Sequence, residues 1–439
     1  MLRISYILRI SVSIIPVVTL MLQVGCSSKK EDEPLVLKTD AELRELFPES
    51  YRPEQLAWAS PMVCAECHTS AHEDWLKSHH SIANRLVDPS LDAEAFSASS
   101  VTDEAEVVYD LVIVGDAFTI AQKDAPTTMP EGHDSPVIGV IGETPLRQFL
   151  VSTSKGRLQT QAMTWDSHNK EWFNVFGDEN RRPTEWGHWT QQGMNWNTNC
   201  AYCHMTHFEK NYSIETNEYN STWLMQTVSC VQCHLGMQDH VEAAKSGQYV
   251  ARTTEANLQI SMENCATCHA RREELTANGF QVGARFFDHY RLTLPDTPGA
   301  YFADGQALEE DYVYGSFMLS RMGHKGITCM DCHNPHSDEP ILPVQGNALC
   351  MRCHATGANE SIVIDPVMHS HHNTESTGNH CISCHMPERT YMERDPRLDH
   401  GFTSPDPKLT IDFGVPNTCN TCHADETTEW ALGYVNTWY

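Results

Sequence analysis

The pattern of hydrophobic and polar positions divides the chain into segments of different character. A mostly apolar run over residues 10–22 follows Arg3 and Arg9, and it is too short to span a bilayer as a stable helix. The run ends in LQVGC at residues 22–26, with a small residue before the cysteine. This pattern predicts an export signal peptide over residues 1–25, followed by a polar tether over residues 26–60.

Helical periodicity appears first over residues 70–87. Apolar and histidine side chains recur there on two adjacent faces, Trp75, His79, Ile82 and Leu86 on one and Leu76, His80, Ala83 and Val87 on the other. Residues 101–185 are instead rich in β-branched side chains, as in EVVYDLVIVGDAFTI, and predict a small β-rich insert with a hairpin turn near Ser154–Gly156. Beyond Gly187 the periodicity is weak, which predicts short helices and loops.

One five-residue pattern, C-x-x-C-H, recurs eight times and uses sixteen of the seventeen cysteines, leaving only Cys26. We number the copies motif 1 to motif 8 in chain order. They are Cys64–Cys67–His68, Cys200–Cys203–His204, Cys230–Cys233–His234, Cys265–Cys268–His269, Cys329–Cys332–His333, Cys350–Cys353–His354, Cys381–Cys384–His385 and Cys419–Cys422–His423.

Three chemistries use paired cysteines at this spacing. Zinc needs only the cysteine pairs, so a zinc site does not explain a histidine after every pair. A redox disulfide of the thioredoxin type needs one pair near a βαβ pattern. Covalent attachment of c-type haem explains the whole pattern, because two thiols add to the porphyrin and the histidine becomes the proximal iron ligand. We therefore expect eight covalent haems.

The remaining histidines outnumber the irons. Sixteen histidines lie outside the eight motifs. A surplus of this size favours bis-histidine coordination at most irons, which closes them to substrates. Seven of the motifs fall within residues 200–423. This segment has too few residues to surround each porphyrin with its own protein core. We therefore expect the haems to pack against one another.

Charge and the N-terminal pattern limit the partners. The chain carries 30 basic and 58 acidic residues, which argues against nucleic acid as a partner. An acidic surface keeps a protein soluble, and it also steers basic redox partners or repels anions. Cys26 is predicted to be the lipidated first residue of a lipoprotein, although Gln23 departs from the usual aliphatic residue. Ordinary cleavage with Cys26 as a bystander is the alternative.

Several stretches carry a family resemblance. CAECHTSAHEDWLKSHHSIA resembles the cytochrome c-552/4 type, in which W-x-x-S-x-H-x-x-A follows the first motif, and this pattern matches Trp75, Ser78, His80 and Ala83. GITCMDCHNPHS and CISCHMPERTYM resemble the doubled-CXXCH proteins. Further stretches, among them NWNTNCAYCHMT and FFDHYRL, resemble multihaem cytochromes fused to tetratricopeptide repeats. The resemblance covers nearly all of residues 60–439; those relatives continue into helical repeats, whereas this sequence ends at Tyr439.

The resemblance implies which histidines are distal ligands. The matching positions are His80, His188, His240, His289, His324, His336, His372 and His400, with His369 as the alternative to His372. It also implies a mainly α and irregular multihaem cytochrome packed around stacked haems, with a small β-rich insert. The first haem segment would be residues 61–100, and residues 186–439 would form a multihaem domain with haem sites 2–8.

The function expected from this fold is electron transfer in the periplasm or at the cell surface. Expected partners are other cytochromes or quinol-linked membrane complexes, with the membrane reached through Cys26. One alternative is a reductase or oxidase of small nitrogen or sulfur compounds at one five-coordinate haem, with His133 or His168 as proton donors. Another is a subunit of a conductive filament.

Overall fold

Two short helices lead into the folded part of the chain. The computed structural model describes residues 61–439 except 124–133, 135, 235–236, 249–257, 277–279, 298 and 310–311. The predicted signal peptide, the tether, Cys26 and His133 lie outside the described residues. Helix α2 (Pro61–Ala65) contains the first cysteine of motif 1, and α3 (Thr69–Lys77) follows the motif directly.

The helix predicted over residues 70–87 is wrong beyond Lys77. Ser78 is extended, and its amide and hydroxyl both donate to the carbonyl of Trp75, which ends α3. The chain then forms a 3-10 turn, η2 (His79–Ile82), and a strand, β1 (Asn84–Leu86), which pairs with β5 (Val137–Ile141). Tertiary strand pairing therefore overrides the helical period of the second half of this segment.

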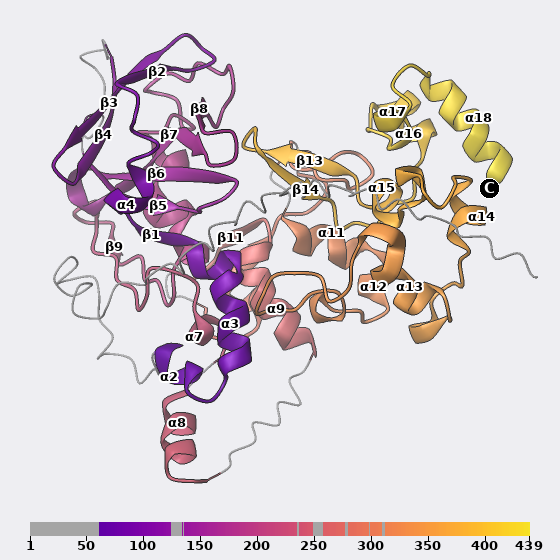
Figure 1. Ribbon diagram of the computed structural model, residues 1–439, viewed down its shortest axis with the longest axis horizontal. Coiled ribbons are helices and arrows are strands. Elements are labelled where there is room, and N and C mark those ends of the chain that lie inside the picture. The colour runs from indigo at the N-terminus through magenta and orange to yellow at the C-terminus, as the bar shows by residue number, and fades with distance from the viewer. Residues whose placement is uncertain are drawn as a thin grey trace, which may run out of the picture. The chain divides into compact units, whose positions relative to one another are not determined.

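Most strands lie between motifs 1 and 2 (Figure 1). An antiparallel five-stranded sheet has the order β1-β5-β6-β7-β8. Its further strands are β6 (Leu146–Ser152), β7 (Leu158–Asp166) and β8 (Glu171–Asn174). A second sheet, β2-β3-β4, consists of β2 (Ser100–Thr102), β3 (Val108–Val114) and β4 (Ala117–Gln122), after helix α4 (Pro89–Asp92).

The hairpin expected near Ser154–Gly156 forms between β6 and β7. Its connection is the 3-10 turn η3 (Ser154–Gly156), in which Lys155 and Gly156 have positive φ angles of 62° and 67°. A Cβ atom at Gly156 would collide with the carbonyl oxygen of Tyr219. Glycine is therefore required here both by its backbone angle and by the close approach of the neighbouring chain.

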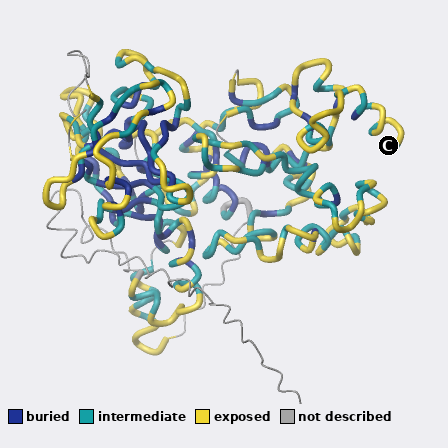
Figure 2. The backbone as a smooth tube through the Cα atoms, turned by 45° about the horizontal axis from the view of Figure 1, so that its top comes forward, coloured by how far each residue is buried: buried dark blue, intermediate teal, exposed yellow. Residues whose placement is uncertain are grey.

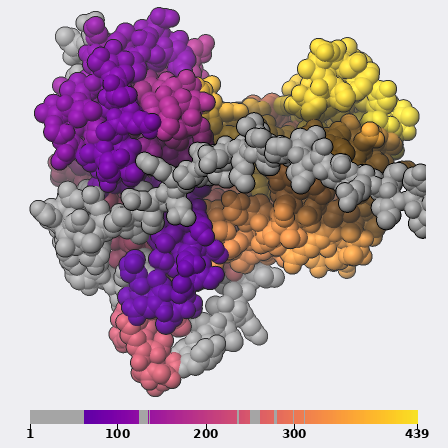
Figure 3. All heavy atoms as spheres, viewed as in Figure 1, coloured from indigo at the N-terminus to yellow at the C-terminus, as the bar shows by residue number. Residues whose placement is uncertain are grey.

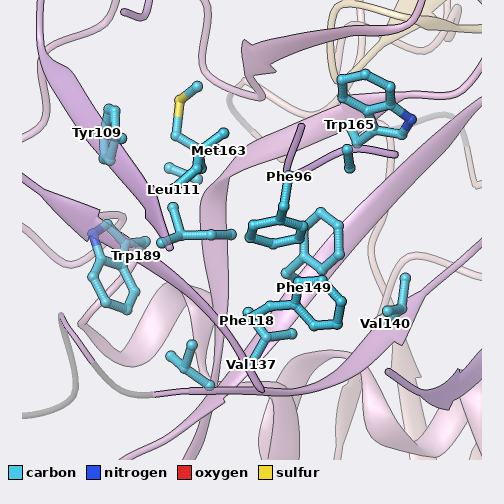
Figure 4. Packing of buried hydrophobic residues seen from close by; sticks show 14 residues of the cluster. Phe96, Tyr109, Leu111, Phe118, Val137, Val140, Phe149, Met163, Trp165 and Trp189 are labelled. Carbon is cyan, nitrogen blue, oxygen red and sulfur yellow. The ribbon is translucent and has the colours of Figure 1, made fainter. Parts of the chain in front are cut away.

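A hydrophobic core fills the space between these two sheets. Phe96, Phe118 and Phe149 are at most 3 % exposed and pack ring against ring, with centroids 4.7 Å apart for Phe96–Phe118 and 5.4 Å for Phe96–Phe149 (Figure 4). Most dark-blue, buried backbone of Figure 2 lies in this β-rich part, whereas the segments that carry the later motifs are largely intermediate or exposed. Smaller hydrophobic clusters pack beside motif 2, around Trp196, and beside motifs 4 and 5, around Phe286.

The segments that carry motifs 2–8 are short helices joined by loops and small hairpins. The helices are α5 (Trp196–Asn199), α6 (Ala201–His204), α7 (Cys230–Cys233), α8 (Met237–Lys245), α9 (Leu258–His269), α10 (Phe286–His289), α11 (Val313–Leu319), α12 (Arg321–His324), α13 (Ala348–His354), α14 (Pro366–Ser370), α15 (Cys381–His385), α16 (Pro407–Phe413), α17 (Cys419–Cys422) and α18 (Thr428–Trp438). The 3-10 turns are η4 (Gln192–Met194), η5 (Cys329–Asp331), η6 (Gln345–Asn347), η7 (Ala358–Glu360) and η8 (Thr377–Asn379).

The prediction of a mainly α fold is wrong. The structure is 35 % helical and 21 % strand, and it contains several sheets. Three two-stranded sheets occur even among the later motifs, formed by β9 (Tyr212–Ser213) with β10 (Glu218–Tyr219), β11 (Arg272–Glu274) with β12 (Tyr290–Leu292), and β13 (Glu388–Tyr391) with β14 (Asp395–Leu398). Strands of two to four residues are too short to leave an alternating pattern that sequence inspection detects.

No helix in the described part of the chain has the length and apolar composition needed to cross a membrane.

Candidate functional site

Each C-x-x-C-H motif is wound into a single helical turn. In motifs 1, 3, 5 and 8 the histidine amide donates to the carbonyl of the first cysteine, over distances of 2.8–2.9 Å. Motifs 4, 6 and 7 lie within α9, α13 and α15. Residues three apart on a helix share a face. The turn therefore presents both thiols to the same side, next to the imidazole that follows them.

The motifs open onto a common space. A single cavity of about 3960 Å³ is lined by cysteines of motifs 2 to 8 and by most of their histidines. Motif 1 borders a smaller cavity of about 470 Å³, lined by Cys67, His68 and His336. An unbroken cavity that touches six cysteine pairs and Cys233 of motif 3 fits a row of flat macrocycles. Among the described residues, no three histidine, cysteine or carboxylate side chains converge on a point that could hold a metal ion.

Six of the eight motif histidines face another histidine ring across this space. The centroid separations are 6.2 Å for His68–His240, 6.2 Å for His80–His269, 6.3 Å for His234–His336, 6.3 Å for His333–His400, 6.0 Å for His369–His385 and 6.2 Å for His372–His423. Direct ring stacking would be much closer, as it is for His371 and Trp438 at 4.2 Å.

These separations match two imidazoles on opposite sides of one iron. Metal–nitrogen bonds of about 2 Å on each side, extended by a ring radius of about 1.15 Å, separate the two centroids by about 6.3 Å. The planes of the six pairs differ by 13° to 75°. Each pair joins a motif histidine to a histidine from another segment, so tertiary folding brings the two rings together.

The outer ring nitrogen of several of these histidines is held by the backbone. Nδ1 donates to a carbonyl oxygen in His204 (Ala83, 2.8 Å), His333 (Asp338, 3.1 Å), His354 (Ile362, 2.8 Å), His385 (Thr403, 2.9 Å), His372 (Ser370, 2.6 Å) and His400 (Leu398, 2.8 Å). A proton fixed on Nδ1 leaves the lone pair of Nε2 for a metal.

Burial favours the neutral, metal-binding form of three histidines that line the site. Burial, aided by the neighbouring charge of His80, lowers the pKa of His269 to about 4. Burial also lowers the pKa values of His204 and His400. At neutral pH these imidazoles are unprotonated at Nε2 and ready to coordinate.

The nine candidate distal histidines divide into two groups. His80, His240, His336, His369, His372 and His400 each face a motif histidine. His369 was expected only as an alternative to His372, but each of the two has its own partner. Helix α14 ends between them, so that His369 faces His385 of motif 7 and His372 faces His423 of motif 8. In the described part of the chain, three candidates face no motif histidine: His188, His289 and His324. Likewise, the motif histidines His204 and His354 face no other histidine ring among the described residues.

Hydrogen bonds distinguish the structural histidines from the ligand candidates. Nε2 of His207 donates to the carbonyl of Val231 at 3.0 Å, and Nε2 of His168 lies 3.0 Å from the hydroxyl of Thr144. Both rings use the nitrogen that a ligand would need for iron. In His188, Nδ1 accepts a hydrogen bond from the amide of Thr190 at 3.2 Å. The rings described above instead donate from Nδ1 to a carbonyl oxygen.

Cysteines of neighbouring motifs lie near one another. The nearest pairs are Cys64 with Cys230, Cys203 with Cys268, Cys265 with Cys329, and Cys350 with Cys381. Cysteines of motifs 3 and 4, of motifs 5 and 6, and of motifs 7 and 8 are also close enough for their charges to interact. These neighbours give the spatial order 1-3-4-5-6-7-8, with motif 2 beside motif 4. Figure 3 shows the start of this series, where α2 and α3 lie beside α8, which carries His240.

One acidic side chain contacts this series directly. Asp338 accepts from Nδ1 of His80 at 2.9 Å and from the amide of His79 at 2.7 Å. Burial opposes ionisation of this carboxyl, but the hydrogen bond and charge of His80 outweigh burial and lower the pKa of Asp338. Sequence reasoning missed Asp338, because it is far from His80 along the chain and only the fold brings the two residues together.

Comparisons with known proteins agree with this geometry. Residues 63–128 and 159–235 match the family described as cytochrome c554 and c-prime, and residues 323–359 match the doubled CXXCH motif. No curated protein matches. The crystal structure of the outer cell wall cytochrome OcwA is similar, with a TM-score of 0.57, 16 % identity and coverage of 87 % of each chain.

A second solved structure is the undecaheme cytochrome from the S-layer of Carboxydothermus ferrireducens. It has a TM-score of 0.42 and 15 % identity, over 89 % of this chain and 59 % of that one. Two family models match, the fold is shared with OcwA, and seven of the C-x-x-C-H turns line one cavity. Together these findings show that this chain is a multihaem c-type cytochrome that binds haem c covalently.

Proposed function

We propose that this protein carries electrons along a chain of eight covalently bound haems, most of which hold their iron between two histidines. The six histidine pairs with centroids 6.0–6.3 Å apart carry this proposal. Haem supplies a reversible one-electron couple when bound. The cysteines fix each macrocycle, and the paired imidazoles fill both axial positions, so that no position remains for a substrate.

The order of the motifs in space supports a continuous route. Motif 1 lies beside motif 3, and the series then runs through motifs 4, 5, 6, 7 and 8. Macrocycles attached at neighbouring motifs would lie next to each other, which is what electron transfer over the length of the chain requires. The second cysteine is exposed at the two ends of the series, Cys67 of motif 1 and Cys422 of motif 8, and also in motif 3, Cys233. These ends are where electrons would enter and leave.

We place the protein in the cell envelope. The apolar run over residues 10–22 and the LQVGC sequence support export and lipid attachment at Cys26. A structural relative is described as an outer cell wall cytochrome. The partners we propose are other cytochromes or quinol-linked membrane complexes, met at the exposed ends of the haem series.

Mass and spin state test this proposal. The intact mature protein should weigh eight haem masses more than its polypeptide, and acidified acetone should not extract the haem. The oxidised protein should be overwhelmingly low-spin, since bis-histidine irons are low-spin. Fewer than seven covalent haems, or a mainly high-spin spectrum, would contradict the proposal.

A second candidate function follows from His204 and His354, which face no second histidine among the described residues. An iron on either one would keep an open position, where a small nitrogen or sulfur compound could be reduced or oxidised. The reduced protein would then bind about one or two carbon monoxide molecules, one per open iron. Negligible binding would leave electron transfer as the function and would indicate ligands for both irons.

A further inference from the structure

Asp338 connects the ligands of two neighbouring haem sites. Its carboxylate accepts from Nδ1 of His80, the ring that faces His269 of motif 4. Its backbone carbonyl accepts from Nδ1 of His333, the histidine of motif 5. Asp338 has a positive φ of 64°, which turns its carbonyl and its side chain toward these two different rings. Cys265 of motif 4 and Cys329 of motif 5 also lie near each other.

The acceptor at His80 differs in charge from those at other ligand rings. Six rings donate Nδ1–H to neutral backbone carbonyls, as described above, whereas His80 donates to a carboxylate. A charge-assisted hydrogen bond pulls the Nδ1 proton more strongly and makes Nε2 a stronger electron donor. A stronger donor stabilises ferric iron more than ferrous iron, so it lowers the reduction potential.

Motif 4 occupies the junction of the series. Its cysteines lie near Cys203 of motif 2, Cys233 of motif 3 and Cys329 of motif 5. Motif 4 therefore offers a direct route for an electron that moves between motif 2 and the later motifs. The potential of the motif 4 haem therefore decides how readily electrons pass between the branch and the main series.

We propose that Asp338 is a positioning residue that holds the haem of motif 4 at a lower reduction potential than a backbone acceptor would give. The carboxylate thereby makes the haem at the junction harder to reduce. This inference rests on the proposed function, because it requires that His80 and His269 ligate one iron.

The test compares two variants that each remove one negative charge. Asp338→Asn keeps an oxygen acceptor for His80, and asparagine tolerates positive φ, so the turn and the backbone bond to His333 remain. Glu339→Gln changes the charge one residue away, at an exposed side chain that does not contact His80. The holoprotein is titrated electrochemically while low-spin ferric signals are followed by electron paramagnetic resonance.

The angle between the two imidazole planes shows which spectroscopic signal belongs to the motif 4 haem. The His80–His269 planes differ by 75°, whereas the other five pairs differ by 13° to 41°. Nearly perpendicular imidazoles give a more anisotropic low-spin signal than nearly parallel ones. The motif 4 haem is therefore expected to have a separate signal that disappears on reduction at its own potential.

The expected result is a rise in the potential of that one signal in Asp338→Asn and no change in Glu339→Gln. Unchanged potentials in both variants, or an equal rise in both, would overturn the role of Asp338 while the electron-transfer proposal stands. A wild-type protein with fewer haems than motifs, or with high-spin irons, would instead contradict the proposed function itself. The two failures are therefore distinguishable.

Discussion

The ring centroids of His369 and His385 lie 6.0 Å apart, and their planes differ by only 13°. His369 is near the C-terminal end of α14, and His385 is the last residue of motif 7. The hydroxyl of Tyr439 donates to the backbone carbonyl of His369. A residue from the end of the chain thus helps to hold a ring that faces a motif histidine.

Replacing His369 with alanine should open one iron. We expect about one haem in eight to become high-spin with the covalent haem count unchanged, and the reduced variant to bind about one carbon monoxide per protein. His371→Ala is the matched control, because His371 stacks on Trp438 at 4.2 Å and faces no motif histidine. Equal spectra for wild type and His369→Ala would contradict the assignment of this pair.

A buried ionic cluster should stabilise the β-rich part. Asp92 has no exposed surface and accepts two hydrogen bonds of 2.7 Å from Arg85, whose guanidinium also bonds Glu143. Asp92→Ala leaves Arg85 buried with part of its charge uncompensated, so we expect the free energy of unfolding to fall by about 3–5 kcal/mol. Chemical denaturation followed by tryptophan fluorescence measures the loss.

The control for this variant is Asp116→Ala. Asp116 is exposed in the turn between β3 and β4, so its removal should change the free energy of unfolding by less than about 0.5 kcal/mol. Similar losses in the two variants would mean that the ionic cluster contributes no more than an ordinary surface charge.

Two glycines with similar positive φ angles allow the cost of the backbone conformation to be measured apart from the cost of a steric clash. Gly115 has a φ of 60° and open space where a Cβ atom would lie, whereas a Cβ at Gly156 meets the carbonyl of Tyr219. Gly115→Ala should lower the free energy of unfolding by about 1–2 kcal/mol through the left-handed conformation alone. Gly156→Ala should cost clearly more, since β10 must also move. Denaturation curves that place Gly156→Ala at or below Gly115→Ala would show that the hairpin turn relaxes freely.

Membrane attachment is predicted from residues outside the described structure. If Cys26 is acylated, the lipid and the tether hold the protein on a membrane. A Cys26→Ser variant should then appear in the soluble extract, whereas Cys67→Ser, which alters a motif cysteine, should stay with the membrane fraction. Fractionation and immunoblotting compare the two. Identical membrane association of the Cys26 variant and wild type would assign the anchor to another part of the protein.

The motifs and the chemistry of attachment could be predicted from the sequence, because both thiols and the proximal histidine of each haem site lie within five consecutive residues. The hairpin at Ser154–Gly156 was likewise visible, since its strands are long and its turn glycine is local. The small hairpins among the later motifs were missed, and with them the balance of helix and strand. The helix over residues 70–87 was overestimated because β1 gains a strand partner from β5, which the local period does not reveal.

Local spacing indicates which thiols and which histidine are expected to bind each haem at the proximal face, and the sequence contains that information. The histidines that face them come from other segments, as when His80 faces His269 of motif 4 and His400 faces His333 of motif 5. Resemblance suggested six of these histidines, His369 only as an alternative, but not their partners. Asp338 contacts His80 only because the turn after motif 5 folds back onto the segment after motif 1. Such contacts depend on how short helices pack around a shared cavity, and only the tertiary structure decides that.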